Sequence, residues 1–268
     1  MTIPDNEIQS RLDLMQPITL EEMSGIRLMN RLDTKYVASK AQLVQLLDML
    51  RNEYYVQETL GRRIIPYLTT YYDTEDHFMY MMHHNKRARR MKVRVRTYVA
   101  SEITFLEVKN KNNHARTKKK RIEVESQDCF RDTVGAHELV QCKTGLNLDY
   151  LGAVVRNQFD RVTLVNRAKT ERLTIDFNVR FHNFETGNDH ATDQLVIIEL
   201  KRDGNVFSPV CNKLKALHIH PTGFSKCCIG MALTDKSLKQ NNFKERIHYL
   251  ERVNGRTLDA DRREAVNS

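Results

Sequence analysis

Charged and aliphatic residues alternate in several successive segments of this chain, and this pattern constrains the fold more than any other feature of the sequence. In KVRVR at residues 92–96, Val93 and Val95 alternate with Arg94 and Arg96. Successive side chains of a β-strand point to opposite faces, so such a segment has one apolar face and one charged face. The same pattern occurs in FLEVK at 105–109, KKRIEV at 119–124, RLTIDF at 172–177 and VIIELK at 196–201.

A solvated outer surface explains this pattern in one strand, but matched charges in successive strands favour a sheet that curls around an anionic ligand. The charge distribution supports a polyanionic partner. Residues 86–121 contain 14 Lys and Arg and only two acids, whereas the net charge of the whole chain is +9. Such a local excess of basic residues is typical of a site for polyanions. The interleaved carboxylates and the small aromatic content of 7% argue against nucleic acid.

Length and composition bound the organisation of the chain. With 268 residues, 40% of them hydrophobic, it can form a single domain over 1–268, with a core at about 25–235 and a polar tail at 241–268. The sequence contains no apolar run of 18 residues, so no transmembrane helix is expected. The first residues lack the basic segment followed by an apolar segment that is typical of a secretory signal. Five cysteines without metal-ligand spacing indicate reduced thiols and a cytoplasmic location.

Strand-like segments make up most of the middle of the chain, with helices at both ends and one between. Ser39 and Gln42 have the spacing of a capping box, and the leucines that follow recur at the interval of one buried helix face. Further helices are expected near 20–29, over 127–139, from Pro209, over 223–233 and near 243–250. Strands are expected at 66–74, 77–84, 91–99, 103–110, 117–124, 152–167, 171–183 and 193–202.

These elements predict an α+β fold built on a closed antiparallel β-barrel of about eight strands, a tunnel with helices packed outside and polar side chains in its lumen. The charges assigned to this lumen are Arg94, Arg96, Lys109, Lys119, Arg121, Arg172 and Lys201, with Glu107, Glu123, Asp176 and Glu199.

So many buried cations require a counter-ion, and a phosphate chain supplies one that matches the planar fork of arginine. The carboxylates are suited to Mn²⁺ or Mg²⁺, which bridge carboxylate and phosphate oxygens. Basic side chains and a metal are the parts that phosphoryl transfer requires. The chain has no GxxxxGK[ST], GxGxxG, HExxH or GxSxG motif, and the adjacent pair His83 and His84 has poor geometry for a metal.

Nine short motifs follow one another in an order that resembles a known family. They are RLDTKY at 31–36, YYDTED at 71–76, KVRVRTY at 92–98, FLEVK at 105–109, KKKR at 118–121, FDRV at 159–162, RLTID at 172–176, IIELK at 197–201 and GFSK at 223–226. Over roughly residues 25–235 the chain resembles the VTC domain. This is the catalytic domain of the vacuolar transporter chaperone polyphosphate polymerase, in the triphosphate tunnel metalloenzyme superfamily.

The resemblance implies roles for individual residues. Catalytic roles fall to Lys35, Arg94, Arg96, Lys109, Arg161 and Arg172. Phosphate and nucleotide binding is expected of Lys119, Arg121, Lys201, Ser225 and Lys226, where the KKKR run also permits a shift by one residue. Glu199 matches the metal-binding glutamate for Mn²⁺ or Mg²⁺. Cys227 stands after FSK where the family leads us to expect an aromatic residue, which alters the tunnel mouth.

The activity that the resemblance implies is a phosphotransferase reaction: a metal-dependent polyphosphate polymerase passes the γ-phosphate of ATP to a growing polyphosphate chain. The partners are then ATP and inorganic polyphosphate, with no nucleic acid and no membrane segment of its own. The chain has no room for the sensing domain or membrane helices of the eukaryotic complex, which implies a free-standing bacterial form. A tunnel triphosphatase, a non-catalytic polyphosphate-binding protein and a structural barrel with a charged surface remain the alternatives.

Overall fold

The computed structural model describes residues 3–23, 31–111, 117–204 and 208–255, and its central feature is one large, mostly antiparallel sheet. The strands are β1 (Gln16–Ile18), β2 (Arg31–Ser39), β3 (Tyr54–Gln57), β4 (Ile65–Asp73), β5 (Arg90–Tyr98), β6 (Ile103–Lys111), β7 (Thr117–Val124), β8 (Gly152–Asn166), β9 (Glu171–Asn183), β10 (Asp189–Thr192) and β11 (Leu195–Asp203). The α-helices are α1 (Asp5–Asp13), α2 (Lys40–Leu50), α3 (Phe78–His84), α4 (Ala136–Thr144), α5 (Pro209–Ala216), α6 (Lys226–Thr234) and α7 (Lys244–Asn254).

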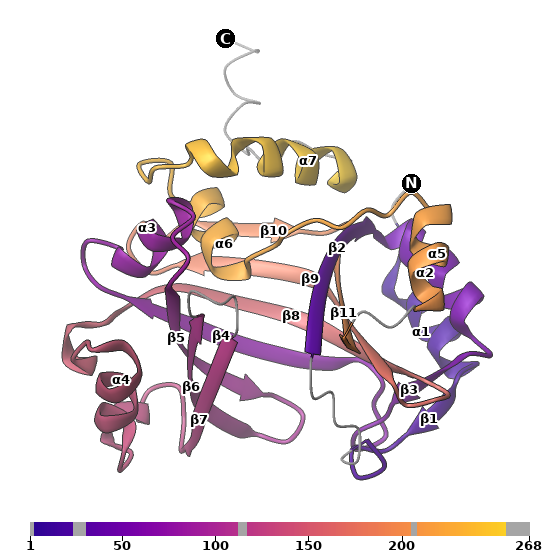
Figure 1. Ribbon diagram of the computed structural model, residues 1–268, viewed down its shortest axis with the longest axis horizontal. Coiled ribbons are helices and arrows are strands. Elements are labelled where there is room, and N and C mark those ends of the chain that lie inside the picture. The colour runs from indigo at the N-terminus through magenta and orange to yellow at the C-terminus, as the bar shows by residue number, and fades with distance from the viewer. Residues whose placement is uncertain (1–2, 24–30, 112–116, 205–207, 256–268) are drawn as a thin grey trace.

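Eight strands form the main path of the sheet, in the order β2-β11-β9-β8-β4-β5-β6-β7, and Figure 1 shows that the sheet is strongly curled. Within the described part of the chain, the outer strands β2 and β7 do not pair with each other. The α+β class and the antiparallel arrangement are therefore confirmed, but the predicted closure into a barrel is wrong. The edge strand β7 carries the exposed residues Lys118–Arg121, and a run of like charges on an edge opposes further strand pairing.

Two apolar cores lie on the outer face of the curled sheet. On one side, leucines of α2, among them Leu46 and Leu47, pack with Ile175 of β9 and Ile198 of β11. The predicted capping box of α2 is confirmed: the Ser39 hydroxyl accepts from the Gln42 N–H, and the Gln42 side chain accepts from the Ser39 N–H. On the other side, α4 covers the aliphatic residues of β5 and β6 (Figure 1).

The helix α6 lies on the inner face of the sheet, so the prediction that the helices pack outside holds only in part. Its residues Cys227–Thr234 are all buried, and they belong to a core that contains Tyr67 of β4, Phe159 of β8 and Ile197 of β11. A helix that is apolar on every side is typical of such an enclosed position. The position of α6 places Ser225 and Lys226, at its N-terminal end, beside the charged part of the inner face.

Close packing of α6 on the sheet makes Gly230 sensitive to substitution. A Cβ atom at this position would lie 2.4 Å from Cδ1 of the buried Phe181. We expect Gly230→Ala to lower the free energy of unfolding by about 1–3 kcal/mol, although alanine normally favours a helix over glycine. Denaturant unfolding of both proteins measures the difference. Gly152→Ala, where a Cβ atom meets nothing within 4 Å, is the control, and a more stable Gly230→Ala variant would contradict this packing.

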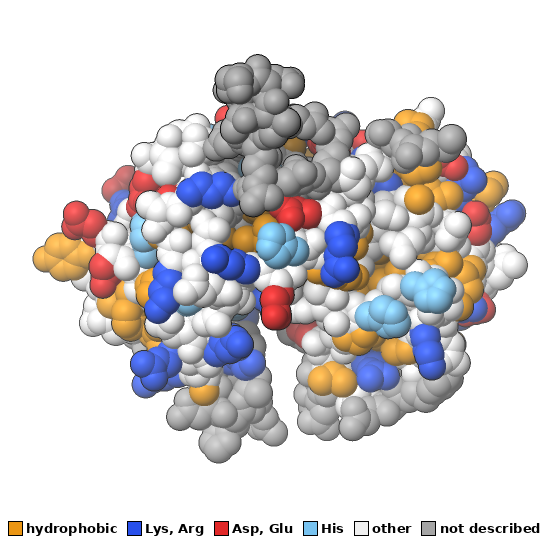
Figure 2. Space-filling view, turned by 90° about the horizontal axis from the view of Figure 1, so that it is seen from above, with side chains coloured by type: hydrophobic (Ala, Val, Ile, Leu, Met, Phe, Trp, Pro, Cys, Tyr) orange, Lys and Arg blue, Asp and Glu red, His pale blue; other side chains and the backbone are white. Residues whose placement is uncertain are grey.

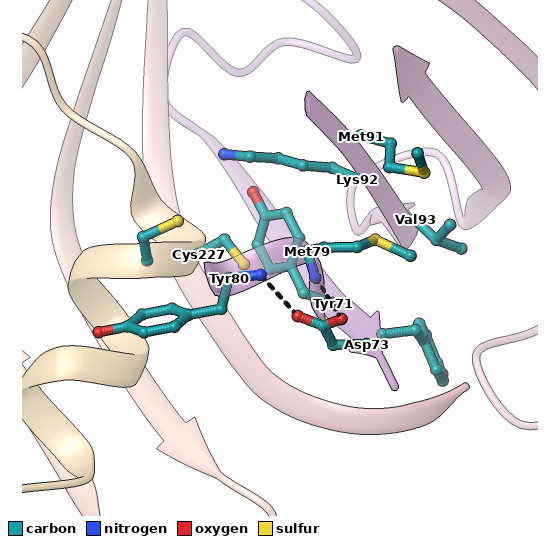
Figure 3. Close-up of a pocket in the computed structure, with 10 residues that line it drawn as sticks. Tyr71, Asp73, Met79, Tyr80, Met91, Lys92, Val93 and Cys227 are labelled. Carbon is teal, nitrogen blue, oxygen red and sulfur yellow. Dashed lines mark hydrogen bonds between the residues drawn. The ribbon is translucent and has the colours of Figure 1, made fainter. Parts of the chain in front are cut away.

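The segment predicted as a strand at 77–84 is instead the helix α3, which begins at Phe78. The cause is Asp73 at the end of β4, whose carboxylate accepts hydrogen bonds from the N–H groups of Met79 and Tyr80, both at 2.9 Å (Figure 3). The Thr74 hydroxyl accepts another from the Phe78 N–H. These acceptors satisfy the first N–H groups of α3 and fix its start, which the apolar run alone does not reveal.

Other differences concern element boundaries. The helix predicted near 20–29 is a turn over 20–23, and the rest of that range lies outside the described residues. The helix predicted over 127–139 begins at Ala136, after the short 3-10 turn Phe130–Asp132, and two further 3-10 turns are Leu148–Tyr150 and Asn241–Phe243. Among the described residues, no helix has the length and apolar character needed to cross a membrane.

Candidate functional site

Strand pairing brings the predicted charged residues onto one face of the sheet. Directly paired residues of antiparallel strands point to the same side. Arg94 of β5 pairs with Tyr71 of β4 and with Glu107 of β6, and Glu199 of β11 pairs with Lys35 of β2. The inner face also carries Lys92, Arg96, Lys109, Lys119, Arg161, Arg172, Asp176 and Lys201, with Lys226 of α6 against Asp176.

We call this surface the basic groove: ten cations, namely Lys35, Lys92, Arg94, Arg96, Lys109, Lys119, Arg161, Arg172, Lys201 and Lys226, with the carboxylates Glu107, Asp176 and Glu199. Figure 2 shows a cleft in the molecule seen from this side, with Lys, Arg and acidic side chains around its inner end. All the predicted site residues lie in the groove or at its margin.

Glu107 anchors one wall of the groove. Its carboxylate is fully buried, accepts from Arg94 Nε at 2.7 Å and forms a second ion pair with Lys119. Burial alone raises the pKa of Glu107, but Arg94, Arg96 and Lys119 outweigh it and hold this pKa far below its ordinary value. Arg94 also donates to the Tyr71 hydroxyl at 3.4 Å. This carboxylate is a structural partner that fixes Arg94 and Lys119 in the groove.

Arg96 differs from its neighbour Arg94 because no carboxylate of the described residues forms an ion pair with it. Its Nε donates to Thr69 Oγ1 at 3.0 Å, and its guanidinium lies over the rings of Tyr67 and Phe159. Burial, and then the charges of Arg94 and Arg161, lower its pKa to about 10. A buried cation without a counter-ion favours the binding of an anion.

Lys109 is in a similar position on the neighbouring strand β6. The charge of Arg94, and then burial, hold the pKa of Lys109 well below its ordinary value. In the part of the chain that the structure describes, its ammonium group has no hydrogen bond or ion pair. Arg96 and Lys109 together form the segment of the groove where positive charge is least compensated.

Asp176 holds two cations on the opposite wall. Arg161 of β8 donates to both of its carboxylate oxygens, at 2.6 and 2.7 Å, and Lys226 forms a further ion pair. Burial raises the pKa of Asp176, but Arg161 and Lys226 lower it far more. Burial, with Arg161 and Lys35, lowers the pKa of Lys226 to about 7 against the pull of Asp176. Asp176 thus fixes Arg161 and Lys226 together on this wall.

Glu199 is the most accessible of the three carboxylates, with 23% of its side chain exposed against 0% for Glu107 and 5% for Asp176. It forms an ion pair with Lys201, while Lys35 Nζ lies 4.0 Å from Oε1 and donates instead to the Phe224 carbonyl. Burial raises the pKa of Glu199, but Lys201 and Lys35 bring it down to about 2. Glu199 is thus ionised at neutral pH, and among the described residues no donor lies within hydrogen-bond distance of its Oε1.

The remaining predicted residues are Arg121, Arg172 and Ser225. Arg121 is exposed on the edge strand β7, with its guanidinium 4.1 Å from the centre of the Phe105 ring. Arg172 is half-buried and pairs in register with Lys201. The Ser225 hydroxyl caps α6 by accepting from the Cys228 N–H. Ser225 and Cys227 therefore lie where α6 begins, and both are buried.

Sequence reasoning missed Lys92, which donates to Ser225 Oγ at 2.7 Å. Figure 3 shows its side chain running toward the hydroxyl of Tyr71, beside Cys227. The alternation of the strand already indicates this position, since Lys92 lies two residues before Arg94 and therefore on the same charged face as Arg94 and Arg96. It also missed Tyr67, Thr69 and Tyr71, whose inward positions depend on the pairing of β4 with β5.

The buried Glu107 predicts a specific dependence of stability on pH. Because its folded-state pKa lies below the ordinary 4.5, the ionised carboxylate stabilises the fold above about pH 4.5, and this contribution is lost as the pH falls further. We expect Glu107→Gln to be about 3–5 kcal/mol less stable at pH 7, since it leaves Arg94 unpaired, and the gap to wild type to narrow toward pH 3. Melting curves of both proteins at pH 3 to 7 measure this difference in stability. Glu123→Gln, at an exposed position, is the control. A difference between wild type and Glu107→Gln that does not change with pH would contradict the role of the ionised Glu107.

Comparison with known families identifies the chain. The family model described as the VTC domain matches residues 30–235, more than half of the sequence. The chain belongs to the VTC domain family. The matched range contains all the charged residues of the basic groove, so the groove is part of the VTC domain itself. No curated protein matches this VTC chain significantly.

Several solved structures are similar to this VTC domain at low sequence identity. A protein of Bacillus halodurans described as a candidate adenylate cyclase has 12% identity and a TM-score of 0.49, covering 74% of this chain and 96% of its own. A candidate adenylyl cyclase from Hippeastrum, described as revealing a dominant triphosphatase activity, has 15% identity and a TM-score of 0.47, covering 76% and 96%. A protein of Pyrococcus horikoshii has 12% identity and a TM-score of 0.43, covering 78% and 99%.

Proposed function

We propose that this VTC domain is a metal-dependent polyphosphate polymerase that transfers the γ-phosphate of ATP to a growing polyphosphate chain in the basic groove. One observation carries the proposal: strand pairing places cations from one wall of the groove to the other on a single face of the sheet. Arg94 and Lys109 lie on β5 and β6, and Arg161 lies on β8 of the opposite wall, where Lys226 shares its partner Asp176. Repeated positive charge with few carboxylates matches the repeated charge of a phosphate chain.

The ionised state of the groove's carboxylates favours the end of a phosphate chain over water as the acceptor of the transferred phosphate. Glu107, Asp176 and Glu199 are all ion-paired, and each has a strongly lowered pKa, so none of these carboxylates is a good general base for activating water. The end of a polyphosphate chain is already ionised near neutral pH and needs no such base. Catalysis then depends on positioning and charge neutralisation, which the arginines and lysines of the groove can supply.

A divalent cation, Mn²⁺ or Mg²⁺, fits Glu199 best. Its side chain is 23% exposed, and no donor of the described residues hydrogen-bonds to its Oε1, whereas both oxygens of Asp176 are engaged by Arg161 and Lys226. Hard cations of this kind bind one or two carboxylates and complete their shell with phosphate oxygens and water. The metal would neutralise charge on the transferred phosphate. Lys35 and Lys201 would hold the Glu199 carboxylate in place.

Within this proposal, Arg96 and Lys109 bind the transferred phosphate, and Arg94, held by Glu107, completes that wall. Arg161 and Lys226 hold the neighbouring phosphate from the opposite wall. Arg172, Lys119, Arg121 and Lys92 extend the track in both directions, with Ser225 at the mouth. The cytoplasmic location and the free-standing single domain stay predictions of the sequence.

One assay tests the proposal. The pure protein is incubated with ATP and Mn²⁺ or Mg²⁺, and the products are separated by gel electrophoresis while free phosphate is measured in parallel. Metal-dependent accumulation of long phosphate chains is the expected result. Accumulation of free phosphate alone would show a triphosphatase, and binding of polyphosphate without turnover would show a non-catalytic binder; either result overturns the proposal.

A further inference from the structure

A second group of metal-ligating side chains lies outside the basic groove. His77 precedes α3, Glu185 lies in the turn between β9 and β10, and Asp235 follows α6. One ligand atom of each residue lies within 4.8 Å of the others. Within the described ranges, this is the one group of three or more His, Cys, Asp or Glu side chains with such spacing. Three separate elements bring these residues together, so the cluster is a product of the tertiary fold.

The chemistry of the cluster is that of an incomplete cation site. His77 Nε2 lies 3.2 Å from Glu185 Oε2, and the other ring nitrogen, Nδ1, is buried without a hydrogen-bond partner among the described residues. Asp235 is 7% exposed, and no described Lys or Arg forms an ion pair with it. Its Oδ1 accepts from the Ser237 N–H and hydroxyl at 2.8 and 2.7 Å, which fixes the carboxylate in orientation. Two carboxylates near one imidazole favour a bound cation.

We propose that His77, Glu185 and Asp235 bind a divalent transition-metal ion, Zn²⁺ in the first place. One imidazole and two carboxylates, with water in the fourth position, form a donor set that Zn²⁺ accepts in tetrahedral geometry. Bonds of about 2.0–2.1 Å place neighbouring donors roughly 3.4 Å apart, and His77 and Glu185 already meet this spacing. The Glu185 side chain is 43% exposed, so an ion can reach the cluster from the solvent on this side.

The position of this site gives it a structural consequence. An ion here ties the start of α3 and the β9–β10 turn to the end of α6, whose other end presents Ser225 and Lys226 to the groove. The Thr186 hydroxyl already donates to the Thr234 carbonyl, so the same turn and the same helix end are in contact. A bound ion therefore restrains α6 on the inner face of the sheet. The proposal does not depend on which reaction the groove performs.

Zinc titration of the full-length protein, after removal of metal by a chelator, tests the site. Calorimetry counts the bound ions, and melting curves with and without Zn²⁺ measure the stabilisation. We expect His77→Ala to bind one Zn²⁺ fewer than wild type and to lose most of the zinc-dependent rise in melting temperature. Glu185→Gln, at a partly exposed position, should bind at least ten-fold more weakly.

Two control variants separate this site from others. His137→Ala removes an exposed histidine that lies 3.8 Å from Asp149, and Glu199→Gln removes the carboxylate proposed for the groove metal; both should keep the zinc-dependent rise in melting temperature. A cooperative melting curve of each metal-free variant establishes that the variant is folded. If His77→Ala does not fold, Glu185→Gln provides the test instead. Zinc stoichiometry and stabilisation equal to wild type in the folded variants would overturn the proposal.

Discussion

Replacement of Arg96 by methionine is expected to reduce product formation by about 10²–10³-fold while the melting temperature stays the same or rises. Arg96 has no ion-pair partner among the described residues, and its charge is repelled by Arg94 and Arg161. Methionine keeps an unbranched apolar side chain against the rings of Tyr67 and Phe159 but removes the positive charge. The fold thereby loses a repulsion, whereas the transition state loses a preorganised cation.

Arg121 provides the matched control for Arg96. It is an arginine of the same face, but it is exposed on the edge strand β7. Arg121→Met should retain activity within about ten-fold of wild type, because exposed charges are screened by solvent. Steady-state rates and melting curves of both variants make the comparison. Near-wild-type turnover in Arg96→Met, or equal losses in the two variants, would contradict the role of Arg96.

Replacement of Glu199 by glutamine is expected to abolish product formation at every metal concentration while ATP still binds. The amide keeps the shape of the side chain and one acceptor oxygen, but it lacks the charge that a hard cation requires. Lys35 and Lys201 lose their shared anion in this variant, so the affinity of the metal-free protein for phosphate should be unchanged or higher. ATP binding and product formation are measured against metal concentration in both proteins.

Glu123→Gln is the control for this experiment, because it removes an equal formal charge from an exposed position on β7. It should keep the metal dependence of wild type. If Glu199 is only a structural partner of Lys201, the glutamine variant keeps a metal dependence like that of wild type with moderately altered activity. That result would exclude Glu199 as a ligand of the metal.

The inner face of the sheet could be predicted because strand periodicity is a local property. Arg94 and Arg96 on β5, Lys109 on β6 and Glu199 on β11 alternate with buried aliphatic residues, so each strand reveals its own charged face. Pairing of these strands then places their charged faces on the same side of the sheet, because the apolar face of each strand must lie on the core. The same periodicity includes Lys92, which was overlooked although the pattern contains it.

Local periodicity could not predict three other features: the closure of the sheet, the position of α6 and the start of α3. Closure depends on whether β2 and β7 meet, a relation between strands far apart in the chain. The sequence of α6 indicates a buried helix but not which face of the sheet buries it. The helix α3 begins where Asp73 accepts backbone N–H groups, and the apolar run from Phe78 is compatible with strand or helix until that contact is known.

The central claim is that phosphates bind in the basic groove, and a crystal structure with a non-hydrolysable ATP analogue and Mn²⁺ tests it most directly. The account predicts phosphates between Arg96 and Lys109 on one wall and Arg161 on the other, with Mn²⁺ bound directly to a Glu199 oxygen. Phosphates bound outside the groove, for example on the basic run at 86–90, with the groove empty, would contradict it.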